Sequence, residues 1–204
     1  MEHNRAVLVN LSSTACMNVA TGKQRAFLEK SKPNMTMPFK VYIYCSEFGT
    51  PVFGNDRSFI TDSFKVLKSE KDFERTSGMH KWNGKVIGEF VCHDVVKLTD
   101  RISHVSVEGT EERDIWEVAR DICDCRSRIF HFLEFECNKK KGCAWYVSEL
   151  KFYDKPKEIS NFCKPDYKHN GFGNWVWKQG SYLSQPPTNW CYVKDWFYSE
   201  EGGV

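Results

Sequence analysis

The sequence lacks the long apolar runs, the excess of one charge and the leader segment that mark several large protein classes. No stretch approaches the ~20 apolar residues that span a bilayer. The start, Met1 to Ala6, is charged and polar, so no secretory signal is visible. The 29 Lys and Arg are nearly balanced by 27 Asp and Glu, which excludes a protein that coats DNA through uncompensated cations. We expect a cytoplasmic protein with no membrane association.

Metal-binding and nucleophile motifs are also missing. The nine cysteines are an odd number with irregular spacing, and no pair of them has the spacing of a zinc knuckle. In a chain without a signal peptide we interpret them as reduced, buried thiols, and we expect neither a metal nor another cofactor. No nucleophile elbow, phosphate-binding loop or dinucleotide fingerprint occurs. Cys92 and His93 are adjacent in a predicted strand, so their side chains point to opposite faces.

What the sequence does have is a globular composition. Its 204 residues are 41% hydrophobic and 15% aromatic, enough for one large core without disulfides. We expect a single domain over residues 1–204. Gly and Pro punctuate a polar stretch at about 46–83, which we interpret as an insertion, and residues at about 164–204 form a C-terminal extension.

The apolar patterns predict short strands interleaved with short helices. Strands are expected at residues 38–45, 84–96, 145–153 and 190–193, with a weak one at 59–66. Helices are expected up to Ala20, with an N-cap among residues 12–14 and Gly22 as the stop, and at 114–122, 126–137 and 156–162. Gly88, inside the second strand, predicts a bulge or a close backbone approach. The class is α+β, a small mixed β-barrel flanked by short helices and carrying insertions.

A basic strip follows the first predicted helix. Between residues 23 and 40 there are five Lys or Arg, and Glu29 is the only acid. Ser12 and Ser13 stand at the preceding strand-to-helix junction, where free backbone amides attract anions. Trp145, Tyr146 and other aromatics later in the chain could stack a base. A solvated basic surface with core aromatics fits the same composition, and spacing alone does not decide between the two.

Several segments, in the same order along the chain, resemble the ASCH-domain family of the PUA-like superfamily, in its phage- and prophage-associated branch. They cover about residues 7 to 193 and are the following: TGK at 21–23, KSKP at 30–33, PFKVYIYC at 38–45, GKVIGEFVC at 84–92, WYVSEL at 145–150, YDKPKE at 153–158 and PPTNWCYV at 186–193.

The resemblance implies a PUA-like β-barrel with a cleft beside its first helix. Members of the family bind RNA or modified nucleosides, and some hydrolyse N4-acetylcytidine. Those hydrolases resemble this chain at Gly22 but have a Lys two residues later and a Thr five residues later. Gln24 and Phe27 stand at these positions here, and neither supplies a base or a hydroxyl. The resemblance therefore favours binding over hydrolysis.

Our first hypothesis is non-catalytic binding of RNA or a nucleotide, one version being a phage protein that sequesters a nucleotide immune signal in the host cytoplasm. The second is a nucleoside or RNA hydrolase, similar to an N4-acetylcytidine amidohydrolase, with a rearranged site built on Glu29, Glu89 and a lysine. The third is a protein–protein interaction module with a host protein partner. The sequence does not indicate the oligomeric state. The candidate ligand-binding residues of the first hypothesis are Ser12, Ser13, Lys23, Gln24, Arg25, Lys32, Trp145, Tyr146 and Ser148.

Overall fold

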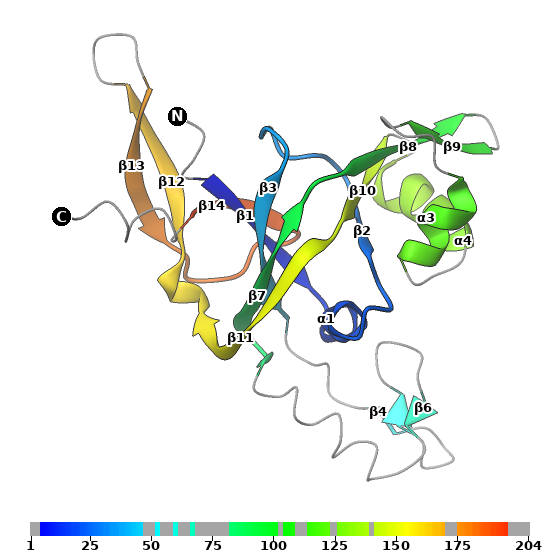
Figure 1. The fold of residues 1–204 in the computed structure, drawn as a ribbon, viewed down its shortest axis with the longest axis horizontal. Helices are drawn as coiled ribbons and strands as arrows, with labels where there is room; N and C mark the ends of the chain where they lie inside the picture. The colour runs from blue at the N-terminus through cyan, green and yellow to red at the C-terminus, as the bar shows by residue number, and fades with distance from the viewer. Residues whose placement is uncertain are drawn as a thin grey trace.

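The computed structural model describes most of the chain outside the predicted insertion. The described residues are 5–46, 82–101, 104–108, 114–122, 126–138, 141–169 and 175–195, together with three two-residue strands, β4 (Val52–Phe53), β5 (Phe59–Ile60) and β6 (Val66–Leu67). Two larger sheets form the centre of the molecule, and a helical layer lies at one end (Figure 1). Most of the predicted insertion lies outside the described residues.

The five-stranded sheet has the order β11-β7-β3-β1-β14. β1 and β3 pair in parallel at its centre, and the other neighbours are antiparallel. The central strands are buried on both faces, which explains their nearly continuous apolar sequences. The strand bounds are β1 (Arg5–Leu11), β3 (Phe39–Cys45), β7 (Lys85–Cys92), β11 (Ser148–Glu158) and β14 (Trp190–Lys194).

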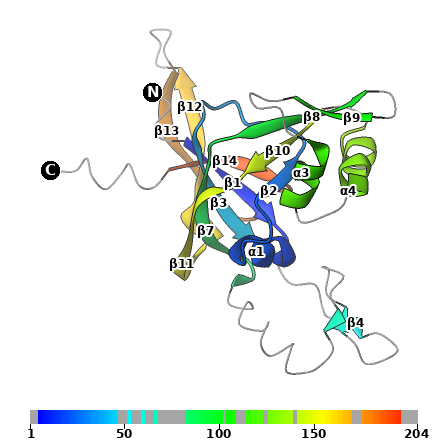
Figure 2. The ribbon, with the colours of Figure 1, turned by 45° about the vertical axis from the view of Figure 1, so that its right-hand side comes forward.

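The four-stranded sheet has the order β2-β10-β8-β9, and its pairings are antiparallel. A helical layer packs against it through Val118, Ile129 and Leu133, which share a core cluster with Leu98 and Ala144 of the sheet (Figure 2). The elements are β2 (Ala26–Glu29), β8 (Val95–Arg101), β9 (His104–Glu108), β10 (Gly142–Tyr146), α3 (Ile115–Asp121), α4 (Arg126–His131) and a π-helical turn (Phe132–Glu136).

The two sheets share a core. Val7 and Ile43 from the larger sheet pack in one cluster with Phe27 and Trp145 from the smaller one. The predicted α+β class is confirmed. Within the described ranges, however, the strands remain in separate sheets and do not close into a single hydrogen-bonded barrel.

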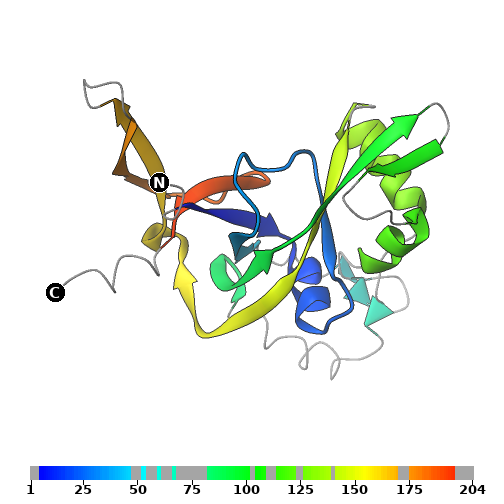
Figure 3. The same cartoon turned by 45° about the horizontal axis from the view of Figure 1, so that its top comes forward.

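The C-terminal part of the chain contributes a long antiparallel hairpin, β12 (Cys163–His169) and β13 (Trp175–Tyr182), which projects from the sheets (Figure 3). Phe162, just before it, packs edge-on against the ring of Tyr42 at 5.0 Å between centroids. Leu183, just after it, is buried in the same cluster. The hairpin is therefore anchored at its base on the outer face of the larger sheet.

Helix ends follow the predicted capping rules. α1 (Ser13–Ala20) begins where the Ser12 hydroxyl accepts a hydrogen bond from the Ala15 amide at 3.2 Å. It ends before Gly22, which has a φ of 67°, a conformation that favours glycine. Asp114 forms a capping box with Glu117 at the start of α3. The strands at 38–45 and 190–193 are confirmed as β3 and β14.

Three sequence predictions are corrected. Residues 145–153 form two strands, because the chain leaves one sheet after Tyr146 and enters the other at Ser148. The strand expected at 84–96 is likewise two strands, because the chain leaves the larger sheet after Cys92 and enters the smaller one at Val95. The predicted helix at 156–162 is only a three-residue turn (Ile159–Asn161), since pairing of β11 with β7 continues to Glu158.

The close approach predicted at Gly88 is confirmed. A Cβ atom at this position would clash with the Lys151 carbonyl oxygen of β11, so only glycine fits there without a shift of the backbone. Among the described cysteines, all seven are free thiols and six are buried, as expected for small apolar side chains. Within the described residues no helix is both long and apolar enough to cross a bilayer.

Candidate ligand-binding pocket

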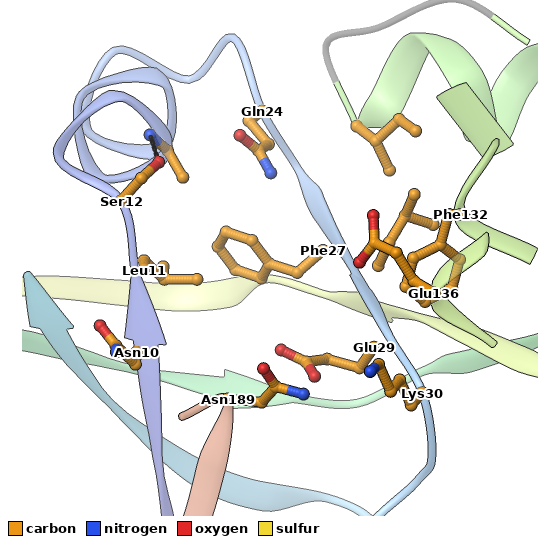
Figure 4. A pocket seen from close by; sticks show the side chains of 13 residues that line it. Asn10, Leu11, Ser12, Gln24, Phe27, Glu29, Lys30, Phe132, Glu136 and Asn189 are labelled. Atoms are coloured by element: carbon orange, nitrogen blue, oxygen red, sulfur yellow. Dashed lines mark hydrogen bonds between the residues drawn. The ribbon is translucent and has the colours of Figure 1, made fainter. Parts of the chain in front are cut away.

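A pocket of about 250 Å³ opens where the end of β1, the start of α1, β2 and the π-helical turn meet (Figure 4). Its wall combines apolar side chains with amides, a hydroxyl and two carboxyl groups. This mixture of apolar walls and a few converging polar groups is typical of small-molecule sites. The lining residues are Asn10, Leu11, Ser12, Ala15, Gln24, Phe27, Leu28, Glu29, Lys30, Ile122, Phe132, Glu136 and Asn189.

One wall is held rigidly by hydrogen bonds around Asn10, at the end of β1. Its side-chain amide donates to the Pro187 carbonyl at 2.9 Å, and its oxygen accepts from the Ser46 hydroxyl at 3.0 Å. Its backbone N–H donates to the Asn189 carbonyl at 2.7 Å. These contacts tie three distant segments together, and they place Asn189 at the pocket.

β2 provides the opposite wall. Phe27 and Glu29 are two residues apart in this strand, so their side chains leave the same face. Phe27 is buried against Phe90, with ring centroids 5.8 Å apart. Glu29 lies opposite Cys143 of β10 in the strand register. A strand that alternates in this way carries a carboxyl group into the core beside an aromatic ring.

Glu29 is the most unusual residue of the pocket. Its side chain is only 7% exposed, yet it makes no hydrogen bond or ion pair within the described part of the chain. Burial raises the pKa of Glu29 to about 7; the negative charge of Glu136 adds to this effect and Lys30 opposes it. A buried carboxyl without a partner costs free energy, and strongly shifted groups in clefts are concentrated at functional sites.

Three further polar groups have hydrogen-bonding capacity left. Gln24 donates from its amide nitrogen to the Ala26 carbonyl at 3.0 Å, which leaves its oxygen as an acceptor. The Ser12 hydroxyl accepts from Ala15 and still has its proton to donate. Among the described residues the Asn189 side chain has no partner, so it offers both a donor and an acceptor. In Figure 4 the Phe27 ring lies between Gln24 and Glu29.

Two of the nine sequence-predicted binding residues line this pocket, namely Ser12 and Gln24. Lys23 and Arg25 flank Gln24, are exposed, and do not line it. Lys32 is also exposed and outside the lining. Ser13 begins α1, and its side chain lies outside the described part of the structure.

The remaining three predicted residues lie beside the core rather than in the pocket. Trp145 has no exposed surface; its ring packs against Phe39 and Trp190, so it offers no platform for a ligand at the surface. Tyr146 is half-buried on the helical side of its sheet. Ser148 donates to the Val91 carbonyl at 2.6 Å and so joins β11 to β7.

The hydrolase site proposed from the sequence is not assembled as predicted. Glu29 is in the pocket and Lys30 lines it, but Glu89 does not. Glu89 lies on β7 and accepts a hydrogen bond from the Tyr153 hydroxyl at 2.6 Å. The second carboxyl group of the pocket belongs to Glu136 instead.

Sequence reasoning missed Asn10, Asn189 and Glu136. They are far apart in the chain, and no spacing rule connects them, since only the sheet pairing and the π-helical turn bring them together. Glu29 did have a signal, because it is the only acid in the basic strip.

The structure is similar to ASCH from Zymomonas mobilis, at 11% identity and a TM-score of 0.41, over 76% of this chain and 73% of that one. A tyrosine-to-phenylalanine mutant of that protein is similar at 9% identity and a TM-score of 0.40, over 76% of each chain. A serine-to-alanine mutant is similar at 10% identity and a TM-score of 0.41, over 85% of this chain and 88% of that one. No protein-family model and no curated protein matches the sequence. The chemistry of the pocket has to be taken from its own residues.

Proposed function

We propose that the pocket binds a nucleotide, either free or as an unpaired residue of RNA, without cleaving it. The observation that carries this proposal is the buried Glu29 carboxyl, which has no partner in the described part of the chain and faces a cavity of about 250 Å³. That volume is below the range of drug-sized pockets, about 300–1,000 Å³, and suits a single base better than a larger ligand. Amide, hydroxyl and carboxyl groups in an apolar wall are the groups that read the edge of a base.

The charges around the pocket support the same proposal. Lys30 lines it, and Lys23 and Arg25 are exposed on either side of Gln24. The interior contains two carboxyl groups, which repel a phosphate. A nucleotide would therefore enter with its base, and its phosphate would stay outside near these cations.

Thermal unfolding of the pure protein with a panel of nucleosides and nucleotides tests the proposal. A ligand that binds only the native state raises the melting temperature. The double variant Lys23→Ala with Arg25→Ala should reduce the shift given by nucleotides and leave the shift given by nucleosides unchanged. Lys155→Ala with Lys164→Ala, which removes two exposed cations outside the pocket lining, is the matched control. No shift with any member of the panel would refute the proposal.

A hydrolase is the second candidate, favoured by the same carboxyl group. A general acid or base works best with a pKa near the working pH, and the pKa of Glu29 is about 7. Glu136 would be its partner carboxyl. Incubation with N4-acetylcytidine and with short RNA, followed by chromatography, separates the two functions. Product that disappears in Glu29→Gln would favour hydrolysis, whereas unchanged ligand that still stabilises the protein would favour binding.

A further inference from the structure

Glu29 and its neighbours also indicate which base the pocket accepts. The carboxyl group has two oxygens and no donor from the protein within the described residues. The adjacent Glu136 carboxyl, when ionised, supplies only further acceptors. Gln24 uses one of its two amide protons on the Ala26 carbonyl and keeps its oxygen as an acceptor and one N–H as a donor. At Glu29 itself, therefore, the donors have to come from the ligand.

We infer that the pocket selects guanine, whose adjacent ring N–H and amino N–H match the two oxygens of the Glu29 carboxylate. Guanine presents this pair of parallel donors on its pairing edge. Adenine and cytosine each present one donor beside one acceptor, and an ionised carboxylate would face that acceptor with a lone pair. This inference rests on the proposed function, since it names the ligand class of the same pocket.

The remaining edge of guanine also finds partners. Its carbonyl oxygen needs a donor, and both the Ser12 hydroxyl and the Asn189 amide have one available. The apolar side chains of Leu11, Phe27 and Ile122 provide walls for a flat ring. The arrangement satisfies the donors and the acceptors of the ligand together, and it gives Glu29 the partner that it lacks.

A guanine bound in this way should release protons. Two N–H donors stabilise the ionised form of Glu29 and lower its pKa on binding. The titratable and charged groups that face Glu29 are Glu136, Lys30 and the Cys143 thiol, whose own pKa is raised by burial. At pH 7, near the free pKa of Glu29, binding should release roughly half a proton. Adenine or cytosine would bind the protonated carboxyl instead and take protons up.

Isothermal titration of the full chain with guanosine, inosine, adenosine and cytidine, in two buffers of different ionisation enthalpy, tests the inference. Guanosine should bind with proton release. Inosine lacks the amino group but keeps the ring N–H, and should bind roughly 10- to 100-fold more weakly, the range of one hydrogen bond to a charged group. At pH 8, where most of Glu29 is ionised, adenosine and cytidine should bind no better than inosine.

Glu29→Gln should weaken guanosine binding by a similar factor and abolish the proton release. Glu134→Gln, at an exposed position of the π-helical turn that does not line the pocket, is the matched control and should leave both unchanged. If adenosine or cytidine binds as tightly as guanosine at pH 8, or if guanosine binding takes protons up, the guanine assignment is wrong while the proposed function stands. If none of the four nucleosides binds, the proposed function itself fails.

Discussion

Two buried carboxyl groups on opposite sides of the larger sheet show how differently this protein treats a negative charge. Asp195 is 4% exposed, accepts from the Tyr42 hydroxyl at 2.7 Å, and forms an ion pair with Lys40 at 3.1 Å. Glu29 is 7% exposed and has no such partner among the described residues. The first charge is satisfied within the fold, because Lys40 and Tyr42 of β3, two strands away from β14 in the same sheet, reach it. The second carboxyl group is available to a ligand, and the proposed binding site is based on this difference.

The largest expected change in stability comes from removing the carboxyl group that has partners, Asp195. Asp195→Ala removes the acceptor from the Tyr42 hydroxyl and the counter-charge from Lys40. Lys40 is only partly buried, so the loss of this acceptor should cost about 3 kcal/mol, the upper end for a buried donor that loses its partner. Urea unfolding at pH 7 measures the loss. Asp154→Ala, at an exposed position, should change the free energy of unfolding very little. A small loss for Asp195→Ala would mean that the two carboxyl groups are not as different as their contacts indicate.

Removing the charge of Glu29 should increase the free energy of unfolding at high pH, whereas Asp195→Ala decreases it. Its pKa rises from 4.5 to about 7 on folding, so the folded protein holds this proton more tightly than the unfolded chain. Stability therefore falls as the pH rises across this window, by up to about 3 kcal/mol. Glu29→Gln should recover most of this lost stability at pH 8, and it should not change the stability near pH 4. Urea unfolding across this pH range, with Glu134→Gln as the control, measures the difference. A variant less stable than the wild type at pH 8 would mean that Glu29 has a stabilising partner.

The smallest expected change in stability concerns a third carboxyl group, Glu89, which accepts a hydrogen bond from the neutral hydroxyl of Tyr153. Tyr153→Phe removes the hydroxyl that donates to Glu89 at 2.6 Å and keeps the ring. The loss of one hydrogen bond to a charged group should cost about 1–2 kcal/mol, because Glu89 is half-buried and water replaces part of the contact. Thermal unfolding measures it, with Tyr182→Phe, at an exposed tyrosine, for comparison. This variant should not change nucleotide binding, and a loss of binding would place Glu89 in the functional site.

The elements predicted correctly from the sequence share one property, a strong local signal. Asp114 and Ser12 cap helices through bonds to residues two or three positions away, and β3 has an apolar run bounded by Pro38. β2 was missed because it is four residues long and lies inside the basic strip. Residues 145–153 were merged into one strand because their apolar pattern does not show that Val147 lies between two sheets.

The predicted binding residues also divide into those with a local signal and those whose position depends on how the sheets pack. Ser12 and Gln24 were predicted from the first helix and the turn that follows it, and both line the pocket. Trp145 was predicted as a stacking platform because its ring is large and the strand around it is recognisable. Its burial between Phe39 and Trp190 depends on which face of β10 meets the other sheet, and that is a matter of register.

The sequence by itself determined the α+β class, the helix caps and the place of an acid within a basic strip, because each of these depends on residues that are neighbours along the chain. Only the tertiary structure decided that Glu29 is buried with no partner among the residues that the structure describes, and that Asn10, Glu136 and Asn189 line the same pocket. Glu136 lies 107 positions after Glu29, and Asn189 lies 179 positions after Asn10. They meet because β1 pairs with β14 and the π-helical turn packs against the sheet that contains β2. Contacts of that kind are set by strand order and register, which no local pattern encodes.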